Sequence, residues 1–191
     1  MSAMIEGLRE AGSDVVDVQL RRLEPLLQRI YATADPHPAF RVARLIGRMK
    51  GGHGRVVPRI EDPTADVDSE APETVLSSSQ MNVLAVSVFL AFNLGMPALP
   101  LDAVILDDPL QSLDDLNLLG LIDLLRRTRD ERQLFISTHD RRFASLLARK
   151  LRPVKNGQRT LIVDLQGWDR EGPAITQHEV ERELVPVRIA A

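Results

Sequence analysis

The chain has 191 residues, of which 44% are hydrophobic and 27% charged, and this balance excludes a disordered or collagen-like protein. Because there is no cysteine, disulfide frameworks and thiolate metal sites are excluded as well. The 24 Lys and Arg residues against 27 Asp and Glu give a net charge of -3, so any contact with nucleic acid must come from a local basic patch.

The N-terminal segment carries charged residues where a secretory signal would be apolar, which predicts a cytoplasmic protein. Residues 1–35 are expected to be a helical segment, because Leu20, Leu23, Leu27 and Ile30 recur at helical spacing. This stripe is either the end of a coiled coil or an ordinary domain helix, since it is too short to tell the two apart.

Residues 36–75 are predicted to form a strand pair followed by an acidic loop. The glycine-rich cluster 51–54 lies between stretches with β-branched residues, as in a hairpin turn. Residues 61–73 hold six carboxylates, two prolines and no basic residue, which is typical of a solvated loop.

Residues 76–167 alternate between helices and strands. We expect helices at 79–94, 113–129 and 141–151, and strands at 103–106, 133–137 and 159–165. The apolar run 83–94 is too short for the roughly 20 residues of a membrane span, so it is predicted to be a core helix, with no membrane partner. The fold class is therefore α/β, with mainly parallel strands flanked by helices. Residues 168–191 form a C-terminal extension whose pattern gives no assignment.

Two of the predicted strands end in residues that carry chemistry. Asp107 and Asp108 follow four apolar residues, and so emerge at the carboxyl end of a buried strand, where open α/β sheets place their ligands. His139 ends the next strand, and a neutral imidazole can donate one hydrogen bond and accept another. The alternatives are an acidic turn at Pro109 and a structural histidine. A metal-dependent hydrolase using His139 and Asp140 is disfavoured, because no other histidine ends a strand.

Two serine-containing segments allow either a structural or a functional interpretation. Leu76 to Gln80 starts the long apolar helix, where free N–H groups can bind a phosphate. The same serines would equally serve as an N-cap of a core helix. Ser112 likewise precedes a predicted helix in a capping pattern.

Taken in this order, the three segments 76–80, 103–109 and 135–140 resemble the C-terminal half of an ABC-type ATPase head. The similarity is to the heads of structural-maintenance-of-chromosomes (SMC) and double-strand-break-repair ATPases, and it covers about residues 75 to 165. It implies a partial P-loop NTPase fold, the C-terminal lobe of such a head, with ATP and Mg²⁺ as cofactors. By this resemblance Asp107 holds Mg²⁺, Asp108 positions the attacking water where the family commonly has Glu, and His139 contacts the γ-phosphate.

The resemblance also implies a dimer of heads. The helix start of one head closes on the ATP of the other, and Ser77 and Gln80 match the family positions. Ser78 and Ser79 stand where glycines are usual. Ser112 and Asp114 match the segment that family members place across the dimer interface.

None of the three lysines follows a glycine, so these 191 residues contain no P-loop. In the family the P-loop lies in an N-terminal half. We therefore expect the chain to complete an ATP–Mg²⁺ hydrolysis site with a P-loop half on another segment or chain, and to be inactive alone. The resemblance couples this activity to DNA repair, chromosome maintenance or defence.

Two other functions fit the same motifs. The chain could be a transporter nucleotide-binding domain, although it has an acidic segment before Leu76 and lacks the complete Leu-Ser-Gly-Gly-Gln pattern. It could also be a truncated, non-enzymatic interaction module. DNA is a candidate partner at two arginine clusters, 126–132 and 141–142, although basic runs are more often solvated helix faces.

Overall fold

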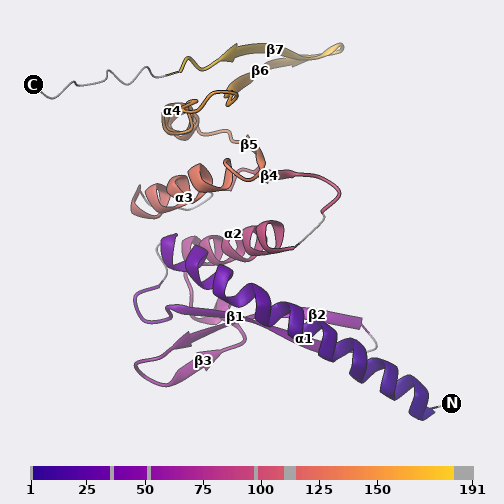
Figure 1. Ribbon diagram of the computed structural model, residues 1–191. Coiled ribbons are helices and arrows are strands. Elements are labelled where there is room, and N and C mark those ends of the chain that lie inside the picture. The colour runs from indigo at the N-terminus through magenta and orange to yellow at the C-terminus, as the bar shows by residue number, and fades with distance from the viewer. Residues whose placement is uncertain (1, 35–36, 51–52, 97–98, 110–114, 183–191) are drawn as a thin grey trace, which may run out of the picture. The chain divides into compact units, whose positions relative to one another are not determined.

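The computed structural model describes residues 2–34, 37–50, 53–96, 99–109 and 115–182 (Figure 1). Its elements, in chain order, are α1 (Ser2–Thr33), β1 (Val42–Lys50), β2 (His53–Asp62), β3 (Val67–Ser69), the 3-10 helix η1 (Pro72–Thr74), α2 (Ser78–Gly95), β4 (Ala103–Asp107), α3 (Asp115–Thr128), β5 (Gln133–Ser137), α4 (Arg141–Lys150), β6 (Leu161–Asp169) and β7 (Gly172–Glu179). The chain divides into two compact units, Met1–Ser137 and Thr138–Ala191, so the boundary falls inside the predicted 76–167 lobe.

The N-terminal unit is organised around the apolar stripe of α1. Leu20, Leu23, Leu27 and Ile30 are all at most 6% exposed, as their helical spacing predicted. This stripe packs against β1 and α2. Between Leu20 and Ile30, α1 is therefore a helix of the domain core.

β1 and β2 form the predicted hairpin, paired antiparallel from Val42 opposite Glu61 to Lys50 opposite His53. The acidic stretch that follows differs from the expected loop, because it contains β3, which pairs antiparallel with β2, and then η1. An ion pair joins β2 to β3 beside their backbone pairing, since Arg59 lies 2.8 Å from Asp68, and Arg44 of β1 lies 2.8 Å from Glu61 of β2. These arginines neutralise carboxylates that the sequence pattern assigned to solvent.

α2 is the one helix in the described part of the chain with the length and hydropathy of a membrane span. One face packs inside the unit, with Leu84, Leu90 and Ala91 at most 1% exposed. At its C-terminal end, a Cβ on Gly95 would overlap the Leu23 side chain, so α1 and α2 approach closely there. These contacts support the predicted core helix.

β4 and β5 pair in parallel, from Ala103 opposite Gln133 to Asp107 opposite Ser137. Their starts are tied to α2, since Asn93 Nδ2 donates to the Ala103 carbonyl (3.1 Å). Arg132, just before β5, donates to the Asn93 carbonyl (3.3 Å) and pairs with Asp102 (3.0 Å). This network fixes the N-terminal ends of the strands, and so the direction in which their carboxyl ends point.

The α/β class is confirmed, but the prediction of mainly parallel strands is wrong, because in the described residues only β4 and β5 pair in parallel. The expected strand 159–165 is β6, and it pairs antiparallel with β7, inside the stretch given no assignment. Only two residues separate β6 from β7, whereas a parallel crossover needs about a dozen. Gly172, at φ 111°, makes the tight reversal possible.

Candidate functional site

The carboxyl ends of β4 and β5 bring a carboxylate and a hydroxyl side by side. Asp107 is the last residue of β4, and its register partner Ser137 is the last residue of β5. The Ser137 hydroxyl donates a hydrogen bond to Asp107 Oδ1. Both side chains are exposed, so this strand end opens to solvent as the sequence predicted.

Asp108 turns the chain away from β4 in a backbone conformation that favours glycine. Its φ is 42°, in the left-handed region, where Asp is among the few tolerated side chains. The Asp108 N–H donates to the Ser137 carbonyl (2.9 Å), and Pro109 is buried immediately afterwards. Residues held in such sparsely populated conformations cluster at functional sites. The corner thus presents two successive carboxylate residues that both contact Ser137, Asp107 through its side chain and Asp108 through its backbone N–H.

The donor set at this corner suits a hard cation that keeps most of its own water. Mg²⁺ prefers oxygen ligands and is commonly bound by one or two carboxylates together with substrate phosphates. Among the described residues no three His, Asp or Glu side chains gather as an all-protein metal cage. The exposed carboxylate of Asp107 is a donor of the kind used by a magnesium ion that is shared with a phosphate ligand.

His139 lies in a bend two residues beyond Ser137, at the start of the C-terminal unit, and its side chain is exposed. The next residue, Asp140, is the N-cap of α4, because its Oδ1 accepts from the backbone N–H groups of Arg142 (2.7 Å) and Phe143 (3.2 Å). Asp140 thus has a structural role as the cap of α4.

The serine-led start of α2 forms a complete capping box. Ser77 Oγ accepts from the Gln80 N–H (3.3 Å), and Gln80 Oε1 accepts from the Ser77 N–H (2.9 Å). Ser77 and Ser78 are exposed, while Ser79 and Gln80 are half-buried. The structural interpretation of these serines therefore holds. It leaves room for an anion, because the Ser77 oxygen acts as an acceptor in the cap and its O–H can still donate.

Ser112 and Asp114, the two predicted interface residues, lie outside the described residues. α3 begins after them, at Asp115.

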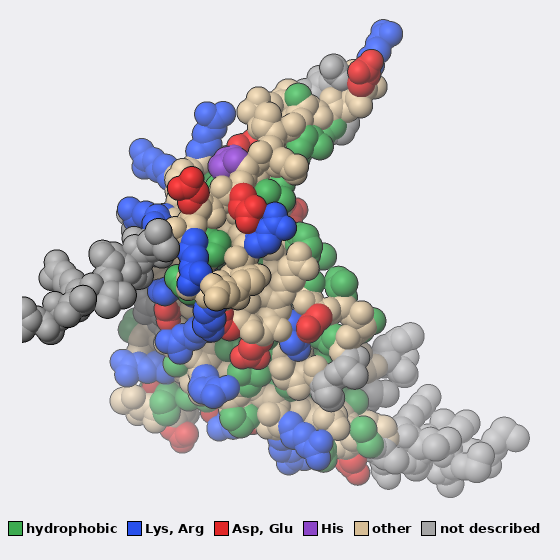
Figure 2. All heavy atoms as spheres, turned by 45° about the horizontal axis from the view of Figure 1, so that its top comes forward, with side chains coloured by type: hydrophobic (Ala, Val, Ile, Leu, Met, Phe, Trp, Pro, Cys, Tyr) green, Lys and Arg blue, Asp and Glu red, His purple; other side chains and the backbone are tan. Residues whose placement is uncertain are grey.

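One face of the β4–β5 pair is apolar and open to solvent. Ile105 is 62% exposed and its register partner Phe135 is 49% exposed, on the face that also carries Asp107 and Ser137. Parallel strands are normally covered on both faces. In the view of Figure 2 hydrophobic side chains, in green, reach the surface among charged ones.

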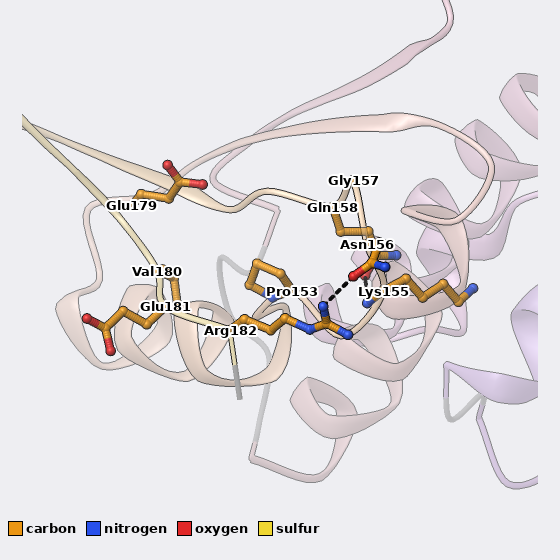
Figure 3. Close-up of a pocket in the computed structure, with 9 residues that line it drawn as sticks. All are labelled: Pro153, Lys155, Asn156, Gly157, Gln158, Glu179, Val180, Glu181 and Arg182. Carbon is orange, nitrogen blue, oxygen red and sulfur yellow. Dashed lines mark hydrogen bonds between the residues drawn. The ribbon is translucent and has the colours of Figure 1, made fainter. Parts of the chain in front are cut away.

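The C-terminal unit has an open, polar hollow of about 410 Å³ beside the loop that follows α4 (Figure 3). Gln158 Oε1 shapes this loop by accepting from the N–H groups of Val154 and Lys155, both at 3.1 Å. Arg182 donates to Asn156, and the carboxylates of Glu179 and Glu181 point away from its guanidinium. The hollow includes none of the predicted site residues.

The sequence analysis did not single out Ser137, the hydrogen-bond partner of Asp107. A usable signal was present, because Asp107 and Ser137 each stand fifth in a five-residue strand. Parallel pairing of two such strands in register places their last side chains next to each other on one face.

No family model matches this sequence. Over 155 residues the chain is 27% identical to the chromosome partition protein Smc of Mycobacterium leprae (strain TN), a match that spans 74% of this chain and 12% of that protein. An SMC ATPase structure from work on ATP-driven dimerization and DNA-stimulated activation has a TM-score of 0.57 at 16% identity, covering 88% of this chain and 89% of that one. An Smc head domain from Pyrococcus furiosus, with an extended coiled coil and bound to the C-terminal domain of ScpA, has a TM-score of 0.60 at 17% identity. That match covers 93% of this chain and 40% of the head chain.

These similarities define the class of protein: an α/β chain with the fold of part of an SMC ATPase head, which is a P-loop NTPase fold. In sequence and in fold the chain is SMC-like, as its three motifs predicted. It spans about an eighth of the length of the curated relative.

Proposed function

We propose that this chain supplies the C-terminal lobe of an SMC-like ATPase head and completes an ATP–Mg²⁺ site with a P-loop half on another segment or chain. The observation that carries the proposal is the Asp107–Asp108 corner at the open end of β4. The corner has the donor atoms for magnesium but no P-loop to hold a phosphate, since the sequence has no Gly-Lys pair.

The chemistry is phosphoryl transfer from ATP to water, achieved by positioning and electrostatics. Asp107 holds Mg²⁺, which neutralises developing charge on the phosphates. Asp108, turned out of the strand at φ 42°, orients the attacking water. His139 contacts the γ-phosphate from the segment that follows β5.

The exposed apolar face of the β4–β5 pair is evidence in favour of a P-loop half that covers it. Ile105 and Phe135 would be buried by an element of the P-loop half that packs on the face that also carries Asp107. Burying the exposed part of these two side chains contributes about 2–3 kcal/mol to association. The Pyrococcus furiosus head is consistent with this arrangement, because this chain covers only 40% of it.

The start of α2 is proposed to act on the ATP of a second head. Ser77, Ser78, Ser79 and Gln80 lie at the N-terminal end of an 18-residue helix, whose N–H groups and dipole favour an anion. Ser112 and Asp114 are assigned to the same head–head interface. Engagement of two heads on ATP and their release after hydrolysis would make the protein act as a dimer.

DNA is the proposed target of this cycle, in chromosome maintenance, repair or defence in the cytoplasm. Of the two arginine clusters, the one on α3 is largely neutralised: Arg127 lies 2.9 Å from Asp123, and Arg132 pairs with Asp102. On α4, Arg141 and Arg142 form no ion pair within the described part of the chain. This second cluster is therefore the better candidate for contact with DNA phosphates.

The test is a mixing experiment in which phosphate release from Mg-ATP is measured. The chain alone is expected to release none above background, and addition of a cognate P-loop half should restore turnover. Asp108→Ala should lower the restored rate at least 100-fold while the fold is kept. The matched control is Asp66→Ala, which removes the other left-handed aspartate (φ 54°) from the β2–β3 turn and should leave the rate unchanged. Restored turnover that survives Asp108→Ala would contradict the assigned role.

A further inference from the structure

We propose that Ser137 is a positioning residue that orients the Asp107 carboxylate toward the magnesium ion. This inference rests on the proposed ATP–Mg²⁺ site and adds a residue to it. The juxtaposition comes from the parallel register, which sets the last residue of β5 beside the last residue of β4.

The first support is the hydrogen bond that the Ser137 hydroxyl donates to Asp107 Oδ1. Because Asp107 is exposed, packing does not restrict its side chain, and Ser137 is the hydrogen-bond partner that the structure gives this carboxylate. With Oδ1 engaged, Oδ2 remains as a ligand with a defined direction. A carboxylate that ligates a metal is commonly oriented by such an outer partner.

The second support is that Ser137 also fixes the next residue of the corner. Its carbonyl accepts from the Asp108 N–H at 2.9 Å and so holds the backbone at the φ of 42°. One residue of β5 thus contacts both carboxylate-bearing residues, the first through its side chain and the second through its backbone. A side-chain substitution removes only the first of these contacts, so the hydroxyl can be tested separately.

Threonine and valine provide a matched pair of variants. Both are β-branched and suit a strand, and they have nearly the same shape, but only threonine retains a hydroxyl. Ser137→Val should raise the Mg²⁺ concentration for half-maximal ATP hydrolysis about 10-fold, in line with the loss of an outer-shell partner, and Ser137→Thr should leave it unchanged. The titration uses the full chain mixed with its P-loop half at saturating ATP. A role confined to strand stability would move both variants together, and equal Mg²⁺ requirements in the two variants would overturn the proposal.

A second readout separates this inference from the proposed function. In the chain alone, labelled with ¹³C at aspartate side chains, the Asp107 carboxyl resonance at fixed pH should move in Ser137→Val and stay in place in Ser137→Thr. If the wild-type mixture hydrolyses no ATP, the proposed function fails and with it the magnesium role. An Asp107 resonance that does not respond to Ser137→Val would instead refute the contact itself.

Discussion

The close approach of α3 to the end of α1 at Gly120 predicts that a glycine-to-alanine substitution, which usually stabilises a helix, destabilises the protein. A Cβ built on Gly120 of α3 would lie 2.8 Å from the Thr33 carbonyl oxygen and 3.3 Å from Ala34 Cα. The atoms in the way are backbone, so they cannot move aside by a rotamer change. An ordinary carbon–oxygen contact is about 3.3–3.6 Å, so Gly120→Ala needs a shift of about half an ångström or more.

Two effects of this substitution oppose each other. Alanine is favoured over glycine in a helix interior by about 0.8–1 kcal/mol. Overpacking of a close contact costs about 1–3 kcal/mol. The net expectation is a destabilisation of about 1 kcal/mol, which for a chain of this size lowers the Tm by about 2–4 °C.

The control is Gly12→Ala in α1, where a Cβ would meet nothing within 4 Å. Here only the helix propensity acts, so the variant should be more stable by up to about 1 kcal/mol. Thermal unfolding followed by circular dichroism gives both values. If Gly120→Ala stabilises the protein as much as Gly12→Ala does, the reasoning from the α1–α3 contact is refuted.

Three further predictions concern the sheet face, the helix cap and the C-terminal hairpin. Ile105→Ser should weaken binding of the P-loop half about 5- to 30-fold in a titration, because about 1–2 kcal/mol of apolar burial is lost. Val67→Ser, which changes another exposed apolar residue (51% against 62% for Ile105) on β3, should leave the affinity unaltered. Ser77→Ala should reduce the free energy of unfolding in urea by about 1 kcal/mol, since the capping box is broken; no change would mean that the box does not hold α2 in place. The hydrogen bond from Arg159 lowers the pKa of Glu179 below 4.5, so the β6–β7 hairpin is stabilised above that pH and loses this contribution as the pH falls through the lowered value. NMR of the cross-strand contacts should show that the hairpin weakens at acid pH. If the Glu179→Gln variant weakens at acid pH in the same way, a group other than Glu179 is responsible.

Much of the fold follows from local sequence patterns. The stripe on α1 and the alternation of α2, β4, α3, β5 and α4 are periodic, and periodicity reports local structure well. The pairing of β6 with β7 was missed because the tail had no clear pattern, although the short connection between the strands requires antiparallel pairing. β3 was missed because Asp68 indicates solvent, whereas its partner Arg59 becomes apparent only when β2 and β3 are paired.

In the candidate site, too, some features follow from the local sequence and others depend on how the strands pair. That Asp107 stands at an open strand end follows from the four apolar residues before it. The hydroxyl of Ser137 could not be assigned from its own segment, because its importance depends on the register with β4. The capping box at Ser77 confirms the structural alternative that the sequence offered, and the phosphate contact of this helix start stays a prediction.

The central claim is that the nucleotide pocket is shared between this chain and a P-loop half. Calorimetry with Mg-ATP tests it most directly, on the chain alone, on the P-loop half alone and on their mixture. We expect no measurable binding to the chain alone and tight binding to the mixture, weakened by Asp107→Asn only when Mg²⁺ is present. Tight binding by the chain alone, or a mixture whose affinity is indifferent to Asp107→Asn, would contradict it.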